Sequence, residues 1–242
     1  NASVDQEDCA RTMAHYDLAA IPVVDESGLL IGIITHDDIV DVLEEEATED
    51  VYRLSNLSDS ELDPDSPIKE QLKGRLPWLY LNTLTALFGA WVISNYEHII
   101  AQAAVLALFQ SVVAGQGGNT ASQNIAMAVR TLATEHVGAR AQRRIIIRQF
   151  FMGILLGVAV GSVVALGVYL WRGNIYLSFV LGLALVANLS FGSMIGVLIP
   201  LGLEKIGVDP ALASSVLVTA ATDSLGFFIF LSLAAHFLQE IQ

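Results

Sequence analysis

The chain has 242 residues, of which 54% are hydrophobic, and its 25 acidic residues outnumber its 12 Lys and Arg residues. So high a hydrophobic fraction excludes an ordinary soluble domain of this size and predicts a membrane protein. The strong negative charge argues against nucleic acid as a partner and favours metal cations and the membrane.

The charge is unevenly distributed along the chain. Residues 1–77 hold 19 of the 25 acidic residues and five of the 12 basic residues. This division predicts an acidic segment in water followed by a segment embedded in lipid. The first residues lack the basic and apolar stretches of a signal peptide, and the abrupt start indicates a chain that begins inside a longer protein. The single cysteine, Cys9, excludes an intrachain disulfide.

The acidic segment has the pattern helix, strand, strand, helix. Helical spacing in QEDCARTMAHYD is followed by the strand-like runs AIPVVD and LLIGIIT on either side of the turn ESG. A second helix is predicted to begin at Thr35, with Asp38 three residues later as an N-terminal capping partner. This is the pattern of a small α/β domain.

The second helix is unusually acidic over residues 37–50, DDIVDVLEEEATED. At helical spacing Asp38, Asp41 and Glu45 share one face. Another face carries Glu46, Glu49 and Asp50. A solvated charged face is one explanation. A bound counter-cation is the other, because like charges four residues apart repel each other.

Five apolar segments follow, each long enough to span a bilayer: residues 77–97, 101–133, 149–171, 175–203 and 211–238. Basic residues cluster before the first segment and between the second and third: Lys69, Lys73, Arg75, Arg140, Arg143, Arg144 and Arg148. The positive-inside rule then predicts a cytosolic N-terminal segment and an external C-terminus. We expect a multi-pass protein of the plasma membrane. The alternative interpretation of the arginine cluster is a nucleic-acid or substrate site.

The second apolar segment is interrupted by AGQGGNTASQN, residues 114–124. We expect a break in the helix there, because irregular backbone at membrane depth is tolerated where it lines a wet cavity. A pore lining would use glycine carbonyls, that of Gly118 among them, and side-chain oxygens of Asn119, Thr120, Gln123 and Asn124. Helix packing through small residues is the alternative.

The fifth apolar segment contains Asp223, although a carboxylate at that depth costs roughly 2.5 to 3.5 kcal/mol. Ser215, Thr219, Thr222 and Gly226 share one helix face beside it. No Lys, Arg or His lies at comparable depth to neutralise the acid, so we expect an external cation. Hard oxygen ligands suit Mg²⁺. One carboxylate per chain suggests a homodimer whose two-fold axis brings two such aspartates together.

Three stretches of the chain resemble the MgtE family of magnesium channels and transporters. YDLAAIPVVDESGLLIGIITHDDIVDVLEEEATED is similar to the end of that family's second CBS domain and the start of its plug helix. GQGGNTASQ and GVDPALASSVLVTAATDSLGF resemble its second and fifth transmembrane helices. The resemblance implies an α-helical membrane protein with five transmembrane helices per chain. Residues 1–43 would be part of an α/β CBS domain, 44–75 the plug helix and linker, and 76–242 a homodimeric pore domain in membrane lipid.

The resemblance also implies two sets of Mg²⁺ ligands. In the pore these are Asp223, Thr219, Ser215 and Asn119 beside Gly118, although Ser215 stands where members often have Asn. Cytosolic Mg²⁺ that closes the pore would bind the Ala14 carbonyl and six acids: Asp17, Asp38, Asp41, Glu46, Glu49 and Asp50. ATP would bind a complete CBS domain, of which this chain holds only a part.

These features lead to the hypothesis of a Mg²⁺-selective channel or transporter gated shut by cytosolic Mg²⁺. A proton-coupled carrier of a small solute, with Asp223 as its protonation switch, is the alternative, and a CBS sensor without transport is a further one. We expect no enzyme activity, because an intramembrane aspartyl protease needs two membrane aspartates and each chain offers one.

Overall fold

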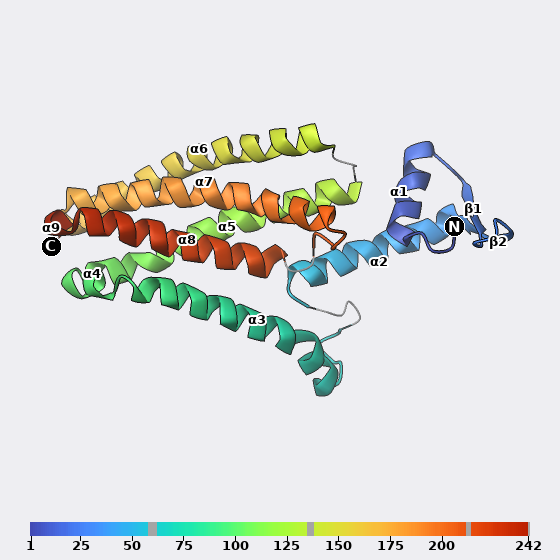
Figure 1. The fold of residues 1–242 in the computed structure, drawn as a ribbon, viewed down its shortest axis with the longest axis horizontal. Coiled ribbons are helices and arrows are strands. Elements are labelled where there is room, and N and C mark those ends of the chain that lie inside the picture. The colour runs from blue at the N-terminus through green and yellow to red at the C-terminus, as the bar shows by residue number, and fades with distance from the viewer. Residues whose placement is uncertain (58–61, 135–137, 212–213, 242) are drawn as a thin grey trace.

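The computed structural model describes residues 1–57, 62–134, 138–211 and 214–241. Its elements are α1 (Gln6–Tyr16), β1 (Ala20–Val24), β2 (Leu30–Thr35), α2 (His36–Leu54), α3 (Ile68–Ser94), α4 (Glu97–Gln102), α5 (Val105–Thr134), α6 (Ala139–Arg172), α7 (Ile175–Lys205), α8 (Ser214–His236) and α9 (Leu238–Ile241). Helices α5 to α8 form an elongated bundle, and the small part made of α1, β1 and β2 lies beyond one of its ends (Figure 1).

The small N-terminal part has the predicted order of helix, strand, strand and helix. Strands β1 and β2 are antiparallel, with Ile21 opposite Ile34. The Asp25 side chain closes the turn between them, accepting from the Ser27 and Leu29 amides at 2.8 and 2.9 Å. Helices α1 and α2 cover the strand pair through a small core: Ala10, Met13 and Ile39, with Ile21, Ile34 and Val42 packed against it.

The predicted cap of α2 is confirmed. The Asp38 carboxylate accepts from the Thr35 amide at 2.7 Å and from the Thr35 hydroxyl at 2.6 Å. These hydrogen bonds lower the pKa of Asp38, because they favour its charged form. Helix α2 then continues to Leu54, so its far end reaches the base of the bundle (Figure 1).

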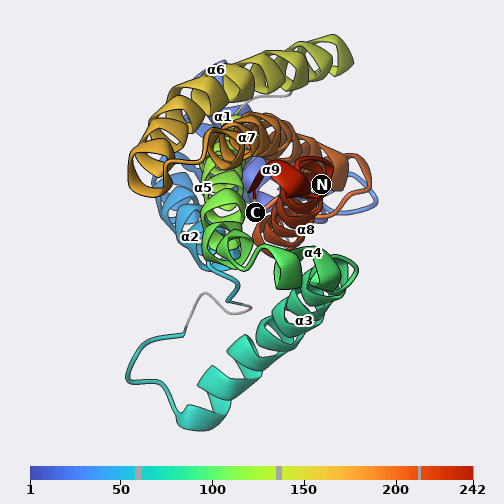
Figure 2. The same cartoon turned by 90° about the vertical axis from the view of Figure 1, so that its left-hand side faces the viewer.

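Four of the described helices are long and apolar enough to cross a membrane: Ile68–Ser94, Ala139–Arg172, Ile175–Lys205 and Ser215–His236. Helix α5 is not among them, because glycines and polar residues at its centre dilute its hydropathy. The expected membrane helices are therefore present, while a count of five spans stays a prediction. Viewed from the end, α5 lies beside α7 and α8, with α6 outside α7 and α3 outside α8 (Figure 2).

The predicted break in the second apolar segment was wrong, because α5 is one helix from Val105 to Thr134. Its small residues serve close packing instead. A Cβ atom at Gly192 of α7 would lie 2.7 Å from the Gly117 carbonyl oxygen of α5. A Cβ atom at Gly196 would lie 2.5 Å from the carbonyl oxygen of Ala121. A continuous helix keeps its backbone groups hydrogen-bonded, which lipid requires, and the missing side chains let α7 approach.

Helices α6 and α7 meet along a glycine seam. A Cβ atom at Gly153 would lie 2.6 Å from the Cα atom of Ser190, and one at Gly157 would lie 2.6 Å from that of Val186. The four-residue spacing of Gly153, Gly157 and Gly161 places all three on the side of α6 that faces α7.

Replacing Gly157 by Val should therefore destabilise the bundle by about 1 to 3 kcal/mol, because either the helices separate or the side chain is strained. Gly167→Val is the matched control, since a Cβ atom at this other α6 glycine has nothing within 4 Å. Thermal unfolding of both variants in detergent measures the difference. Equal unfolding temperatures would show that the seam does not hold α6 to α7.

Candidate functional site

Gly118 of α5 and Asp223 of α8 face each other. A Cβ atom at Gly118 would lie 3.8 Å from the Thr222 hydroxyl oxygen and 4.0 Å from Oδ1 of Asp223. The carboxylate is half-buried, so part of it remains accessible from outside the bundle. Two motifs that lie about 100 residues apart in the chain thus meet at one place, and the missing side chain of Gly118 leaves space beside the acid.

Ser215 and Thr219 precede Asp223 at four-residue intervals on α8. Both line a cavity of about 440 Å³ whose opposite wall includes Arg75 and Trp78 of α3. The Ser215 hydroxyl donates to Oδ1 of Asn56 at 2.5 Å. Four-residue spacing places these two hydroxyl side chains and the carboxylate of Asp223 on the same side of α8, and all three offer hard oxygen atoms.

The polar side chains of residues 114–124 divide between the surface and the helix contacts. Asn119 and Gln123 are exposed. The Thr120 hydroxyl donates to the Gln116 carbonyl at 3.0 Å, and the Asn124 amide donates to the Ser193 carbonyl at 2.7 Å. Asn124 thus joins α5 to α7, as the packing alternative proposed, while Asn119 remains available to an ion.

Asn188 of α7 is a candidate that the sequence arguments missed. It is 0% exposed, and its amide donates to the Val113 carbonyl of α5 at 2.7 Å. The same side chain lies against Gly117 of α5, and its Nδ2 atom would be 2.8 Å from a Cβ atom at Gly226 of α8. The side-chain amide of Asn188 therefore lies between α5, α7 and α8 and sets the distances between them next to Gly118 and Asp223. Its signal was a lone Asn within the apolar run LALVANLSFG.

The end of α2 is attached to the base of the bundle. Arg53 forms ion pairs with Glu49 on its own helix and with Asp209 before α8. Leu54 packs against the buried cluster made by Ala121, Ile125, Val129, Ala211 and Val218. With the hydrogen bond between Asn56 and Ser215, these contacts link the acidic helix to the start of α8.

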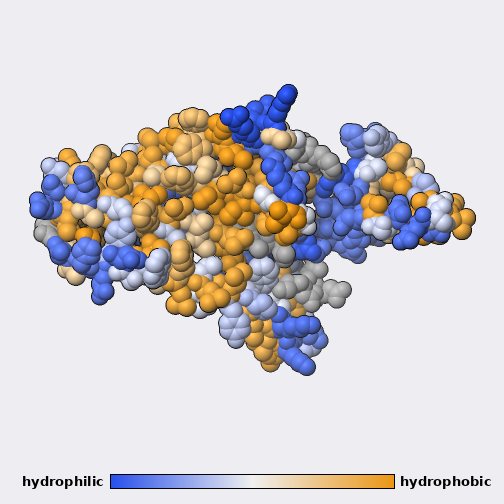
Figure 3. Space-filling view, viewed as in Figure 1, coloured by the Kyte–Doolittle hydropathy of each residue, from blue (hydrophilic) through white to orange (hydrophobic). Residues whose placement is uncertain are grey.

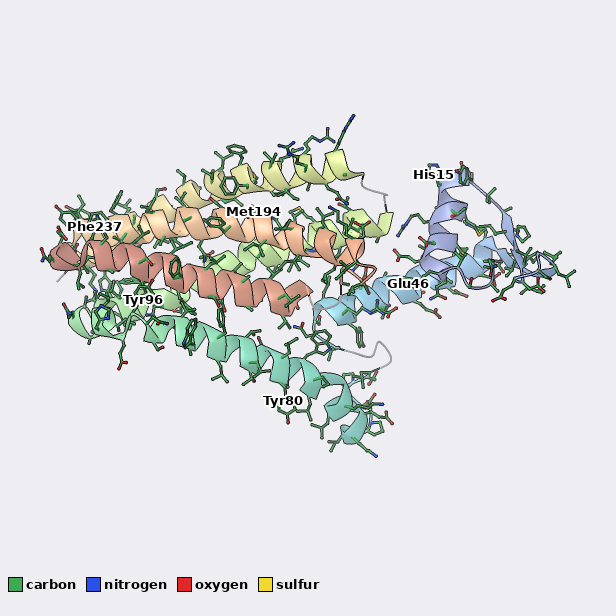
Figure 4. The ribbon with its side chains drawn as sticks, viewed as in Figure 1. His15, Glu46, Tyr80, Tyr96, Met194 and Phe237 are labelled. Carbon is green, nitrogen blue, oxygen red and sulfur yellow. The ribbon has the colours of Figure 1, made fainter. Side chains whose placement is uncertain are left out.

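A second cavity, of about 1090 Å³, lies between α1, α2 and the end of α5. It brings together three of the groups predicted to bind cytosolic Mg²⁺, namely Ala14, Glu46 and Asp50, with Glu7 beside them. Figure 4 shows Glu46 on the part of α2 that lies next to α1. On the other wall Arg11 donates to the Ala133 carbonyl at 3.2 Å, so α1 also touches α5.

The acids of this cavity repel one another. Burial raises the pKa of the Asp50 carboxyl to about 6, and the nearby carboxylates of Glu7 and Glu46 add to the rise. Gln6 donates to Glu46 at 2.7 Å, and Arg11 pairs with Glu7 at 3.0 Å, so part of this charge is already compensated. A cation between Glu46 and Asp50 would relieve what remains.

The other predicted cytosolic ligands lie elsewhere. Asp17 ends α1 in a left-handed conformation with φ 50° and is exposed. Asp38 caps α2, Asp41 is exposed, and Glu49 pairs with Arg53. Among the described residues no group of three or more His, Cys, Asp or Glu is placed to hold one metal ion. Mg²⁺ often keeps several of its waters. A hydrated ion can be held by carboxylates that are too far apart to bind a dehydrated ion directly.

Comparison with known proteins gives two family matches. Residues 110–233 match the MgtE model, described as a divalent cation transporter, and residues 1–45 match the CBS domain.

The chain is also similar to three curated proteins called magnesium transporter MgtE. It is 37% identical to the one from Thermus thermophilus over 239 residues, which cover 98% of this chain and 53% of the relative. It is 37% identical to that from Bacillus subtilis over 241 residues, with 100% and 53% covered. For Enterococcus faecalis the identity is 36% over 235 residues, with 97% and 51% covered. The chain thus spans about half the length of the curated relatives it matches.

Replacing Asn188 by Leu should destabilise the bundle by about 1 kcal/mol, because the variant keeps the volume and loses the interhelical hydrogen bond. Ser190→Ala is the control on the same helix, since the Ser190 hydroxyl donates within α7, to the Val186 carbonyl at 2.6 Å. Reversible unfolding in detergent measures both. An Asn188→Leu variant as stable as the parent would show that the amide does not space the three helices.

In the absence of divalent ions, the packing of α1 on α2 should weaken as the pH rises. The pKa of Asp50 in the folded protein, about 6, lies above the ordinary 3.8. The folded state therefore binds the Asp50 proton more tightly than the unfolded state does. The resulting contribution of Asp50 to the stability of the folded state is complete below about pH 4 and is lost as the pH rises through 6.

Distances between spin labels on α1 and α2, measured across this range, check the effect. Asp50→Asn should remove the pH dependence, whereas Glu44→Gln, an exposed acid of the same helix, should keep it. An unchanged profile in Asp50→Asn would exclude this carboxyl as the group that titrates.

Proposed function

Because the chain belongs to the MgtE family of divalent cation transporters, we propose that it forms the pore and part of the regulatory region of a Mg²⁺ channel. The observation that carries the proposal is the half-buried carboxylate of Asp223 next to Gly118. A membrane acid needs a compensating charge, and a passing cation supplies one.

The donors near Asp223 suit a hydrated ion. Mg²⁺ dehydrates reluctantly and is commonly held through one or two carboxylates and its own waters. In this proposal Asp223 supplies the charge, while the hydroxyls of Thr219 and Ser215 and the amide of Asn119 accept hydrogen bonds from the ion's waters. Gly118 leaves room for the water shell.

A second copy of the chain completes the pore in this proposal. One carboxylate balances only half the charge of a divalent ion, and the accessible side of Asp223 lies at the surface of a single bundle. A two-fold axis beside α5 and α8 would place two such acids on one ion and cover both from lipid. The exposed apolar residues of α3, Leu84, Leu87 and Trp91 among them, offer further surface to the partner or to lipid.

In this proposal, Mg²⁺ binding in the cavity lined by Glu46 and Asp50 controls whether the pore is open. Without Mg²⁺ the charges of Glu46 and Asp50 repel, and with it they approach each other and the Ala14 carbonyl. The change reaches α8 through the pair of Arg53 with Asp209 and the bond of Asn56 with Ser215. The exposed Asp17, Asp38 and Asp41, together with Glu49, remain candidate ligands for further ions in the same proposal. We place this part in the cytosol and the C-terminus outside.

Replacing Asp223 by Asn should lower the Mg²⁺ current across a patch at least about tenfold. The variant loses the negative charge that stabilises the ion, and a loss of roughly 1.4 kcal/mol in that stabilisation is enough for a tenfold effect. Glu97→Gln, which neutralises an exposed acid of α4, is the control and should conduct like the parent.

Raising internal Mg²⁺ should close the parent, and Asp50→Asn should require a higher concentration for closure.

Two results would contradict the proposal. A normal Mg²⁺ current in Asp223→Asn would remove the pore site. Solute flux that follows a pH gradient and persists without divalent ions would favour the proton-coupled carrier instead.

A further inference from the structure

The first turns of α6 carry four exposed arginines on one face: Arg140, Arg143, Arg144 and Arg148. At 100° per residue they fall within an arc of about 140°. Gln142 points the opposite way, where it is buried and its amide approaches Glu204 of α7 at 3.4 Å. The four arginines, which we call the arginine face, therefore point away from the bundle.

The arginine face has no counter-charge in the part of the chain that the structure describes. Helix α6 contains no Asp or Glu over its 34 residues. The ion pairs of the described residues involve Arg11 and Arg53, and none involves the arginine face. Four like charges within three turns repel one another, and the amides at the start of a helix add to the positive potential. An anionic partner from outside the chain would remove this repulsion.

The same face of α6 continues directly into apolar side chains. Ile147, Phe151, Leu155 and Val158 lie within the arc of the arginines at helical spacing, and between 45% and 66% of each residue is exposed. They belong to the stretch of α6 that can cross a membrane. Figure 3 shows a hydrophilic projection at this end of the bundle next to a broad hydrophobic surface. The change from basic to apolar on one face marks the level at which hydrocarbon meets headgroups.

We propose that the arginine face binds the phosphate groups of anionic phospholipids. Continuity with the lipid-facing apolar side chains favours lipid over a soluble anion, because a lipid fills both parts of the surface at once. Guanidinium groups form paired hydrogen bonds with phosphate oxygens, and the negative surface of an anionic bilayer attracts basic residues close to it. This inference goes beyond ion transport and does not depend on the pore.

Native mass spectrometry of the purified protein tests the site with phosphatidylglycerol and phosphatidylcholine as probes. The parent should retain phosphatidylglycerol preferentially. Changing all four arginines to Gln should reduce that preference at least about tenfold. Arg172→Gln is the control, because Arg172 lies at the other end of the same helix, stacked at 4.4 Å over Trp171, and should leave the preference unchanged.

A second measurement uses the unaltered protein in vesicles and does not depend on how the variant folds. Modification by an arginine-selective dicarbonyl reagent should be slower at the arginine face in phosphatidylglycerol than in phosphatidylcholine vesicles. The site is overturned if the quadruple variant keeps the preference, or if modification is equal in both lipids. Equal protection by inorganic phosphate in phosphatidylcholine vesicles would overturn the assignment to lipid.

Discussion

The close approach of α5, α7 and α8 determines what the rest of the bundle can do. Glycines at 117, 192 and 226 remove the side chains that would keep these helices apart, and the buried amide of Asn188 occupies the space between two of them. In lipid, helices gain little from the hydrophobic effect on one another, so small residues and interhelical hydrogen bonds must supply the attraction. Gly118 and Asp223 are neighbours because this contact exists.

That contact also explains why an acid is tolerated in α8. Asp223 is neither sealed inside the bundle nor turned wholly outward, and Ser215, Thr219 and Thr222 before it on the same helix carry hydroxyl groups. A carboxylate in such surroundings stays partly accessible while its helix remains packed. The architecture thus separates two tasks. Buried amides such as Asn124 and Asn188 hold the helices together, whereas the half-buried side chains of Asp223 and Thr219 would meet the ion in the proposed pore.

Local patterns predicted much of this arrangement. The cap formed by Thr35 and Asp38 depends on neighbours in the chain, and the strand pair depends on alternation and a turn, so both could be derived from sequence. The expectation that Asp223 meets a cation followed from the cost of a carboxylate in lipid, and it stays a prediction. The continuity of α5 could not be derived, because glycines and amides suit both an irregular loop and a tightly packed helix.

Other features depended on three-dimensional neighbours that no spacing reveals. Asn188 owes its role to glycines on two other helices. Helical spacing placed the acids of α2 on two faces, yet members of one face have different neighbours. Glu49 pairs with Arg53, while Glu46 and Asp50 line the cavity with Ala14, and on the other face Asp38 caps the helix. Which acid faces which neighbour depends on how α1 and α5 pack beside α2. The residues of α5 that take part lie far from α2 in the sequence.

Helix α2 is long enough to connect the small N-terminal part to the bundle, and its two ends make different contacts. As a single rod of 19 residues, it is about 28 Å long. Its carboxylates extend along most of this length, and Glu46 and Asp50, which line the acidic cavity, lie in its second half. Arg53 in its last turn pairs with Asp209, and Asn56 just beyond the helix bonds to Ser215. Only about 10 Å of continuous helix separates Glu46 from Arg53. In the proposed gating, a shift of the acids would therefore reach the start of α8 through a short and rigid segment.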